Sequence, residues 1–212
     1  DSSDASDADD DADDDVEDDD TDDDADDEFD DDADDDTQTE CDTWTDSTSG
    51  LTWIVDPAVT TPYTGLTWAE AVDFCESLAC DGYDDWRLPT ISELRSIVDG
   101  CNATKYGGEC GVTDECLDFE CGYGGEEYHC TGCGDGAGPS NGCYIKDNLE
   151  ATCDSGSMLR TFWSNSPVEN DSELEVWDIE FLKGGIKDAR ITDDDFANAR
   201  CARGEFAPVK DK

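Results

Sequence analysis

The sequence predicts an α+β domain over residues 41–212, preceded by an acidic low-complexity segment over residues 1–40. Two amphipathic helical patterns follow each other between residues 67 and 100, and alternating strand patterns return after residue 160. A stretch rich in cysteine and glycine, residues 101–153, separates the two regions. Helices segregated from a mainly antiparallel sheet define the α+β class, and a body of this length can bury a core of its own.

The segment 1–40 holds 26 of the 60 acidic residues and no Lys, Arg or Gly. Because it has almost no apolar side chains and its charges repel one another, we expect a disordered, extended spacer. Loose binding of calcium is the other interpretation, since carboxylate oxygen is the ligand that calcium prefers. We expect a removed leader upstream, and a lipid-modified cysteine there would suit such a spacer.

The body is also acidic, with 34 Asp and Glu against 12 Lys and Arg. Such a charge disfavours nucleic acid, anionic lipid and sulfated glycans, which are all negative. It suits cationic partners, divalent ions and neutral ligands. No stretch approaches the ~20 apolar residues of a membrane span, so none is expected.

The first regular elements are a strand and a helix. Residues 51–55 alternate as a strand does, and the pattern ends before Pro57. Thr67 and Glu70 have the spacing of a capping box, with Thr at the N-cap and Glu three residues later. Apolar residues then recur at helical spacing, which predicts an amphipathic helix over residues 68–79.

A second capping box, formed by Thr90 and Glu93, predicts a helix over residues 91–99. Gly100 is placed to end it. Between the two helices, apolar residues alternate over residues 85–89, which we interpret as a short buried extended segment.

Twelve cysteines, all at or after Cys41, indicate disulfides and an oxidising compartment. A zinc protein is the alternative, but the chain has one Cys-x2-Cys pair, Cys130 and Cys133, and one histidine, His129. Eight cysteines and eleven glycines fall in residues 101–153. We therefore predict a loop-rich insertion there, stapled by disulfides instead of a core of its own.

Strands dominate the rest of the chain. Residues 161–164 read as one strand, and residues 176–182 alternate, with three large apolar residues on one face and two acidic residues on the other. Residues 183–185 form a hairpin turn, and the chain returns from residue 186 onward. Residues 199–203 predict a last short strand.

These residues resemble a bacterial family, the C-terminal domain of the Legionella collagen-like adhesin. Matching segments appear in the family's order and cover most of residues 50–204. They are Gly50-Leu51-Thr52-Trp53, Leu66-Thr67-Trp68-Ala69-Glu70-Ala71, Asp85-Trp86-Arg87-Leu88-Pro89-Thr90, Phe162-Trp163-Ser164 and Ala199-Arg200-Cys201-Ala202-Arg203-Gly204. The run from Asp85 to Thr90 is the most specific.

The resemblance implies a variant of the C-type lectin fold and a disulfide between Cys75 and Cys201. It also implies a recognition domain. The namesake adhesin is associated with sulfated glycans, but such ligands need basic residues that this chain lacks. The carbohydrate-binding signatures of calcium-dependent lectins are absent as well, and Trp177-Asp178 lacks the Asn of their Trp-Asn-Asp motif.

Asp188, Asp193, Asp194 and Asp195 form a candidate calcium site, since closely spaced carboxylates suit this ion. The competing interpretation is a solvated acidic turn. Calcium is the one cofactor that the sequence suggests.

Arg87 lies between apolar residues and could contact a ligand, although pairing with Glu93 or Asp85 is favoured. Three tryptophans could stack on sugar rings, but their spacing favours the core. They are Trp86, Trp163 and Trp177.

His129 has no recognisable nucleophile beside it in the sequence, and the Cys130–Cys133 pair lies in a Gly-rich stretch and not at the start of a helix. We therefore expect a non-enzymatic, extracellular or surface-bound module that binds a carbohydrate or protein ligand. The insertion 101–153 is favoured as its binding face, because loops on a rigid scaffold carry recognition. The alternative is a structural subunit of an extracellular fibre or matrix, joined by divalent ions through the acidic segment.

Overall fold

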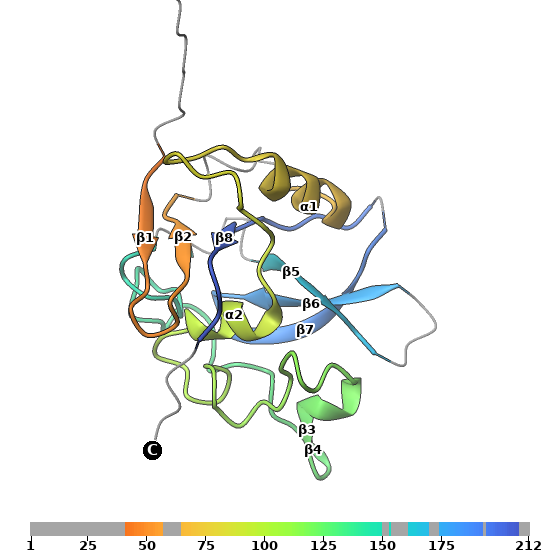
Figure 1. The fold of residues 1–212 in the computed structure, drawn as a ribbon. Coiled ribbons are helices and arrows are strands. Elements are labelled where there is room, and N and C mark those ends of the chain that lie inside the picture. Colours follow the sequence, from red (N-terminus) through yellow and green to blue (C-terminus); the bar gives the residue numbers. More distant parts are fainter. Residues whose placement is uncertain are drawn as a thin grey trace, which may run out of the picture. The chain divides into compact units, whose positions relative to one another are not determined.

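The computed structural model describes residues 41–56, 65–149, 153, 161–169, 174–192 and 194–207. The segment 1–40, predicted to be a spacer, lies outside them, so that prediction and the boundary at residue 41 stay predictions. Figure 1 shows the described elements in order. They are β1 (Thr43–Thr45), β2 (Thr52–Ile54), α1 (Trp68–Ser77), α2 (Ile91–Ser96), the 3-10 helix η2 (Phe119–Gly122), β3 (Tyr123–Gly124), β4 (Glu127–Tyr128), β5 (Thr161–Pro167), β6 (Glu175–Glu180), β7 (Gly185–Arg190) and β8 (Ala202–Arg203).

Every strand pair among these elements is antiparallel, which confirms the α+β class. The strands form sheets in the orders β1-β2-β8, β3-β4 and β5-β6-β7. The predicted last strand shortens to the two residues of β8, which pair with β2 and so bring the end of the domain back to its beginning. Strand β1 was not predicted from the sequence.

Both predicted capping boxes are present. The Thr67 side chain accepts a hydrogen bond from the Glu70 backbone, and the Glu70 carboxylate accepts one from the Thr67 backbone at 2.9 Å. Helix α1 ends at Ser77, two residues earlier than expected, and α2 ends at Ser96, three residues earlier. The last turn of α2 tightens, because the Ile97 backbone N–H bonds to the carbonyl three residues before it.

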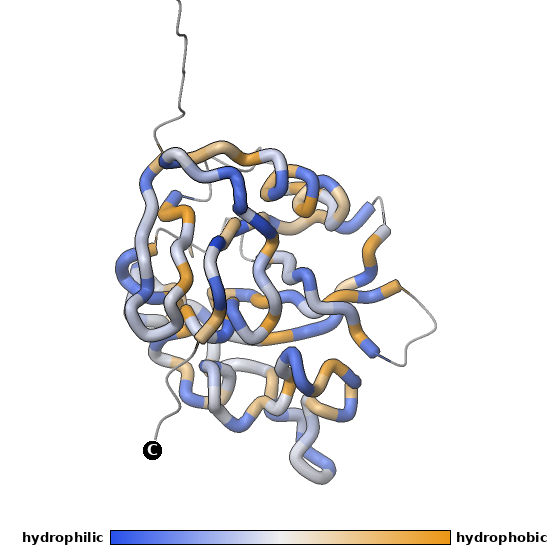
Figure 2. Tube along the Cα trace, in the orientation of Figure 1, coloured by the Kyte–Doolittle hydropathy of each residue, from blue (hydrophilic) through white to orange (hydrophobic). Residues whose placement is uncertain are grey.

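The sheet β5-β6-β7 is covered on both faces. Trp177 and Ile179 of β6 join the cluster that holds the apolar residues of α2 and of the insertion, whereas Val176 joins the cluster that holds α1. In Figure 1, α1 lies on one side of this sheet and β3–β4 lie on the other. Figure 2 shows that the hydrophobic stretches concentrate on the helices and this sheet.

One of the two acidic residues predicted opposite the apolar face of β6 is buried. Asp178 is buried, at 1 % exposure, because the face opposite Trp177 is covered as well. Burial raises the pKa of Asp178 to about 8, although the nearby Lys187 ammonium, 3.7 Å away, acts in the opposite direction.

The insertion shares the core of the domain. Its buried residues Val112, Tyr144, Ile145 and Leu149 pack in the same cluster as Leu94 of α2. It therefore builds no separate core among the described residues, as its composition predicted.

One buried side chain of α2 organises the first part of the insertion. The Arg95 guanidinium donates hydrogen bonds to the backbone carbonyls of Thr104 (2.9 Å), Lys105 (2.9 Å) and Val112. Burial lowers its pKa to about 10. A cation on the buried side of the helix was not expected, and its partners are carbonyl oxygens of the loop that follows α2.

Six disulfides cross-link the described residues, among which no cysteine is free. Four join the insertion to itself, and Cys75–Cys201, the pair that the family resemblance implied, ties α1 to the residue before β8. Cys130 and Cys133 pair with other cysteines, which agrees with a structural role. The pairs are Cys41–Cys80, Cys75–Cys201, Cys101–Cys133, Cys110–Cys130, Cys116–Cys121 and Cys143–Cys153.

Candidate functional site

Three aromatic side chains gather on the insertion, on η2 and the β3–β4 hairpin. We call Phe119, Tyr123 and Tyr128 the aromatic platform. Phe119 and Tyr123 are 40 % and 38 % exposed, and Tyr128 is half-buried between them and the sheet. The ring centroids of Tyr123 and Tyr128 lie 5.1 Å apart, those of Phe119 and Tyr123 5.6 Å, and those of Phe119 and Tyr128 6.0 Å. Large apolar rings left at the surface in contact with one another are a feature of binding faces.

Local geometry explains why the rings meet. Tyr123 of β3 pairs directly with Tyr128 of β4, so both side chains leave the hairpin on the same side. Gly122 allows the close approach, because a Cβ atom there would lie only 2.3 Å from the Tyr128 ring. The Asp118 side chain caps η2 by accepting from the Glu120 backbone at 2.9 Å, which fixes Phe119 in the first turn.

The platform rests on the core. The Phe119 ring lies nearly parallel to that of the fully buried Trp177, with centroids 6.3 Å apart. The Trp177 indole donates to the Leu117 carbonyl at 3.0 Å, and the Tyr128 hydroxyl donates to the Ile186 carbonyl at 3.1 Å. Hydrogen bonds from both sides therefore hold the insertion against the sheet beneath the platform.

Disulfides hold the same region in place. Cys116–Cys121 ties η2 to the segment just before it, and Cys110–Cys130 anchors the chain two residues after Tyr128. A surface whose rings are already ordered loses less side-chain entropy when it binds a ligand. The platform is thus preorganised, although the insertion has little regular structure.

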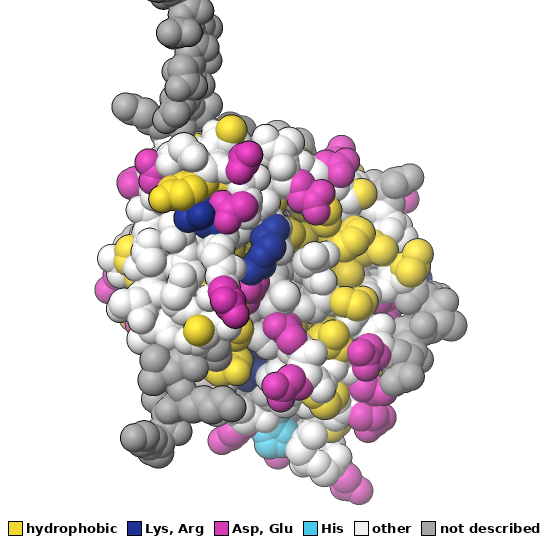
Figure 3. Space-filling model, in the orientation of Figure 1, with side chains coloured by type: hydrophobic (Ala, Val, Ile, Leu, Met, Phe, Trp, Pro, Cys, Tyr) yellow, Lys and Arg dark blue, Asp and Glu magenta, His cyan; other side chains and the backbone are white. Residues whose placement is uncertain are grey.

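The electrostatic surroundings of the platform are acidic. Residues 118–129 contain four Asp and Glu residues and no Lys or Arg. Burial, together with the nearby Asp188 carboxylate, raises the pKa of Tyr128 to about 12, so its hydroxyl stays protonated and keeps its hydrogen bond. Figure 3 shows acidic side chains spread over the face that it displays and few basic ones.

His129 lies at the base of the hairpin, next to Gly124. Its Nδ1 atom is 3.5 Å from the Glu109 carboxylate, and a Cβ at Gly124 would meet the imidazole ring. The structure therefore gives His129 a carboxylate partner. Among the described residues every cysteine is held in a disulfide, so none of them offers a free thiol beside it.

Arg87 has the structural partner that the sequence favoured. Its guanidinium forms two parallel hydrogen bonds of 2.6 Å with the buried Glu93 carboxylate and a third with the Gly204 carbonyl at 3.1 Å. The other predicted partner, Asp85, pairs with Arg203 at 2.6 Å. The three tryptophans weighed as sugar contacts are all core residues, as their spacing predicted; they are Trp86, Trp163 and Trp177.

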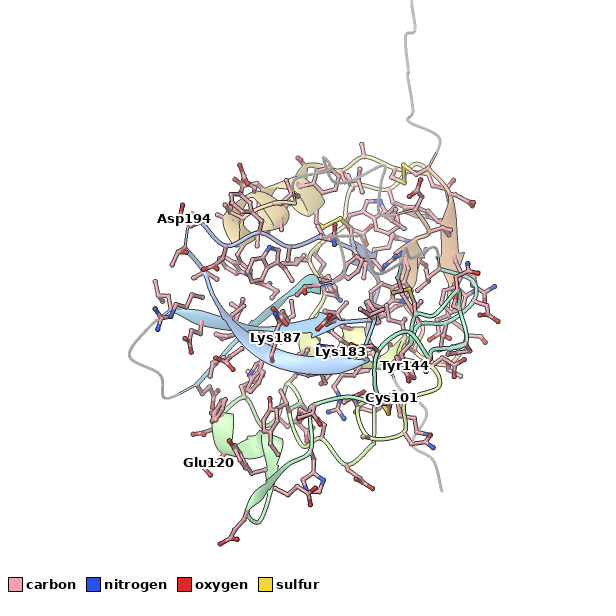
Figure 4. All side chains as sticks on the ribbon, turned by 180° about the vertical axis from the view of Figure 1, so that it is seen from behind. Cys101, Glu120, Tyr144, Lys183, Lys187 and Asp194 are labelled. Atoms are coloured by element: carbon pink, nitrogen blue, oxygen red, sulfur yellow. A yellow bond between two sulfur atoms is a disulfide. The ribbon has the colours of Figure 1, made fainter. Side chains whose placement is uncertain are left out.

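The predicted calcium ligands do not form a described cluster. Asp193 lies outside the described residues, Asp188 lies on β7 beside Tyr128, and Asp195 accepts a hydrogen bond from Thr192 at 2.7 Å. In Figure 4, Asp194 lies beyond β7, far from Glu120 on η2. Within the described part of the chain, no three His, Cys, Asp or Glu side chains are grouped to hold a metal ion. The calcium site stays a prediction.

Sequence reasoning favoured the insertion as a binding face but did not single out the platform. The signal was present, since three aromatic residues fall within ten positions of a stretch otherwise poor in large apolar residues. The stretch has no periodicity, however, so nothing in the sequence showed that these rings meet.

The fold and the site together define a disulfide-stapled α+β domain that carries a preorganised aromatic surface. The model of the Lcl C-terminal domain family matches residues 42–203, and the chain belongs to that family. A comparison with curated proteins finds no match. No described helix is long and apolar enough to cross a membrane.

Proposed function

We propose that the chain is a non-enzymatic recognition module of the cell surface, which binds a carbohydrate through the aromatic platform. One observation carries the proposal: Phe119 and Tyr123 stay well exposed although Phe119 lies over the buried Trp177 and Tyr123 contacts Tyr128. The carbon–hydrogen faces of a sugar ring are apolar and match an exposed aromatic ring, while its hydroxyl groups keep contact with water.

The location is part of the proposal. Six disulfides in one domain are typical of proteins that fold in an oxidising compartment. A secreted or lipid-anchored form would place the domain outside the cell, with residues 1–40 as the spacer. We also assign the core to a variant of the C-type lectin fold, with calcium as an optional ligand of the acidic loops.

A glycan array screened with the full chain, in calcium and again in chelator, tests the proposal. Phe119→Ala and Tyr123→Ala should each weaken the binding that the unmodified protein shows. Phe196→Ala is the matched control, because Phe196 is an exposed aromatic residue, at 56 %, outside the platform. Binding that neither platform substitution weakens, or no binding to any glycan, would refute the proposal, and loss in chelator alone would show that calcium takes part.

The acidic segment supports a second candidate, a matrix subunit joined by divalent ions. Its 26 carboxylates can condense such ions without forming a defined cage. Light scattering of the full chain during a calcium titration tests this function. Reversible assembly that salt and chelator both dissolve would favour it, and a monodisperse protein throughout the titration would exclude it.

A further inference from the structure

We propose that the aromatic platform is selective for a cationic sugar, a glycan whose exposed units carry a protonated primary amine, as glucosamine does. The inference rests on the proposed function, because it names the class of carbohydrate that the same surface takes. It is argued from the charges around the platform and from the way the rest of the domain distributes its basic residues.

Three glutamates next to the platform have no Lys or Arg partner among the described residues. Glu120, Glu126 and Glu127 are all exposed, and none forms an ion pair with a Lys or Arg in the described part of the chain. Figure 4 shows Glu120 on the outer side of η2. The platform thus combines exposed rings with uncompensated negative charge.

Elsewhere in the domain, three carboxylates are paired with basic side chains. Asp46 pairs with Lys146 at 2.8 Å, Glu93 with Arg87 at 2.6 Å and Asp85 with Arg203 at 2.6 Å. These pairs lie at the β1–β2 turn, in the first turn of α2 and beside β8. Three of the described basic residues therefore lie where the fold uses them, and no described Lys or Arg pairs with Glu120, Glu126 or Glu127.

The basic residues of the neighbouring strand β7 do not offset the negative charge next to the platform. Lys187 pairs in register with Asp178, and because Asp178 points away from Trp177, Lys187 lies on the opposite face of the sheet from the platform. Arg190 lies on the platform's face, but its guanidinium is 3.6 Å from the Glu175 carboxylate. Asp188, on the same face, adds a further negative charge beside Tyr128.

A protonated amino sugar satisfies both features at once. Its ring faces are apolar and can stack on Phe119 or Tyr123, while its ammonium group at the ring edge can reach a carboxylate. The ammonium is also attracted to the electron-rich face of an aromatic ring. Acetylation of the amine removes the charge and keeps the ring, and sulfation reverses the charge, so the two changes separate stacking from electrostatics.

The test is isothermal titration calorimetry of the full chain with two short oligomers of equal length, one of glucosamine and one of N-acetylglucosamine. We expect the amine form to bind more tightly. Phe119→Ala combined with Tyr123→Ala should weaken its binding about tenfold, equivalent to about 1.4 kcal/mol. Glu120→Gln combined with Glu127→Gln should keep the platform and lower the preference for the amine form about fivefold.

The control is Glu76→Gln, which removes an exposed carboxylate from α1 and should leave both affinities unchanged. All variants keep residues 1–40, so a difference between them reports on the platform and not on the acidic segment. A preference for the amine form that the double aromatic substitution leaves unchanged would overturn the inference. Equal binding of both oligomers, lost on substituting Phe119 and Tyr123, would overturn it too while leaving the proposed function intact.

Discussion

The buried carboxylate of Asp46 should make part of the stability of the domain depend on pH. Asp46 lies in the turn between β1 and β2, and its side chain is 4 % exposed. It accepts hydrogen bonds from the Lys146 ammonium at 2.8 Å, from the Ser49 hydroxyl at 2.7 Å, and from both the backbone and the hydroxyl of Thr48. The turn is thereby joined to the insertion.

The pKa of Asp46 gives the size of the effect. Burial alone would raise this pKa, but the hydrogen bonds from Lys146, Thr48 and Ser49 outweigh it and lower the pKa from 3.8 to about 2. Each pKa unit corresponds to about 1.4 kcal/mol, so the ionised carboxylate contributes about 2 kcal/mol to the free energy of unfolding. Because the folded pKa is the lower one, this contribution is complete above the unfolded pKa and disappears as the pH falls from about 4 to about 2.

Asp46→Asn removes the charge and nearly keeps the shape. Urea unfolding of the oxidised protein, followed by tryptophan fluorescence at a series of pH values, should show the variant about 2 kcal/mol less stable near neutral pH. The two proteins should converge as the pH falls to about 2 and below, where the native carboxylate also takes up its proton. Asp73→Asn, an exposed carboxylate of α1, serves as the control and should show no such gap. A gap of constant size across the range, or none at neutral pH, would refute the reasoning.

Three further substitutions test other parts of the fold. Glu93→Gln keeps the helix cap but leaves the half-buried Arg87 without its charged partner. Urea unfolding should show a free energy of unfolding about 2 kcal/mol lower, and an unchanged urea midpoint would contradict this. Replacing Cys75 and Cys201 by Ser opens a separation of 126 residues and should lower the free energy of unfolding by about 4 kcal/mol, measured by calorimetry. Arg95→Met leaves three carbonyls without their donor, and amide hydrogen exchange should rise in residues 103–112; uniform exchange would count against this role.

The elements that the sequence predicted well depend on short-range signals. Both capping boxes formed, because Thr and Glu three residues apart satisfy each other's backbone whatever surrounds them. The β6–β7 hairpin formed around Gly184, which adopts a φ of +66° that other residues rarely take. Alternation along β6 also placed Trp177 and Ile179 correctly on one face.

The parts that could not be predicted depend on what packs against what. Alternation puts Asp178 opposite Trp177, but it does not reveal that the opposite face is covered too. The packing around Arg95 could not be predicted either, because its acceptors are loop carbonyls with no sequence signature. The neighbours of the platform residue Phe119 are set by disulfides in a stretch without periodicity. Cysteine pairing within the insertion had too many combinations to resolve from spacing.

The disulfides of the insertion and those of the scaffold form separate sets, so the insertion can be replaced as a unit. Its eight cysteines pair only with one another, at separations of 5, 10, 20 and 32 residues, while Cys41–Cys80 and Cys75–Cys201 belong to the surrounding scaffold. A recombination event that deletes or replaces residues 101–153 therefore removes cysteines in complete pairs. No unpaired cysteine is left behind to form a wrong disulfide. A substitute loop must still supply acceptors for Arg95 and a cation for Asp46. Under that constraint, one scaffold can exchange the surface of its insertion without redesigning its oxidative folding.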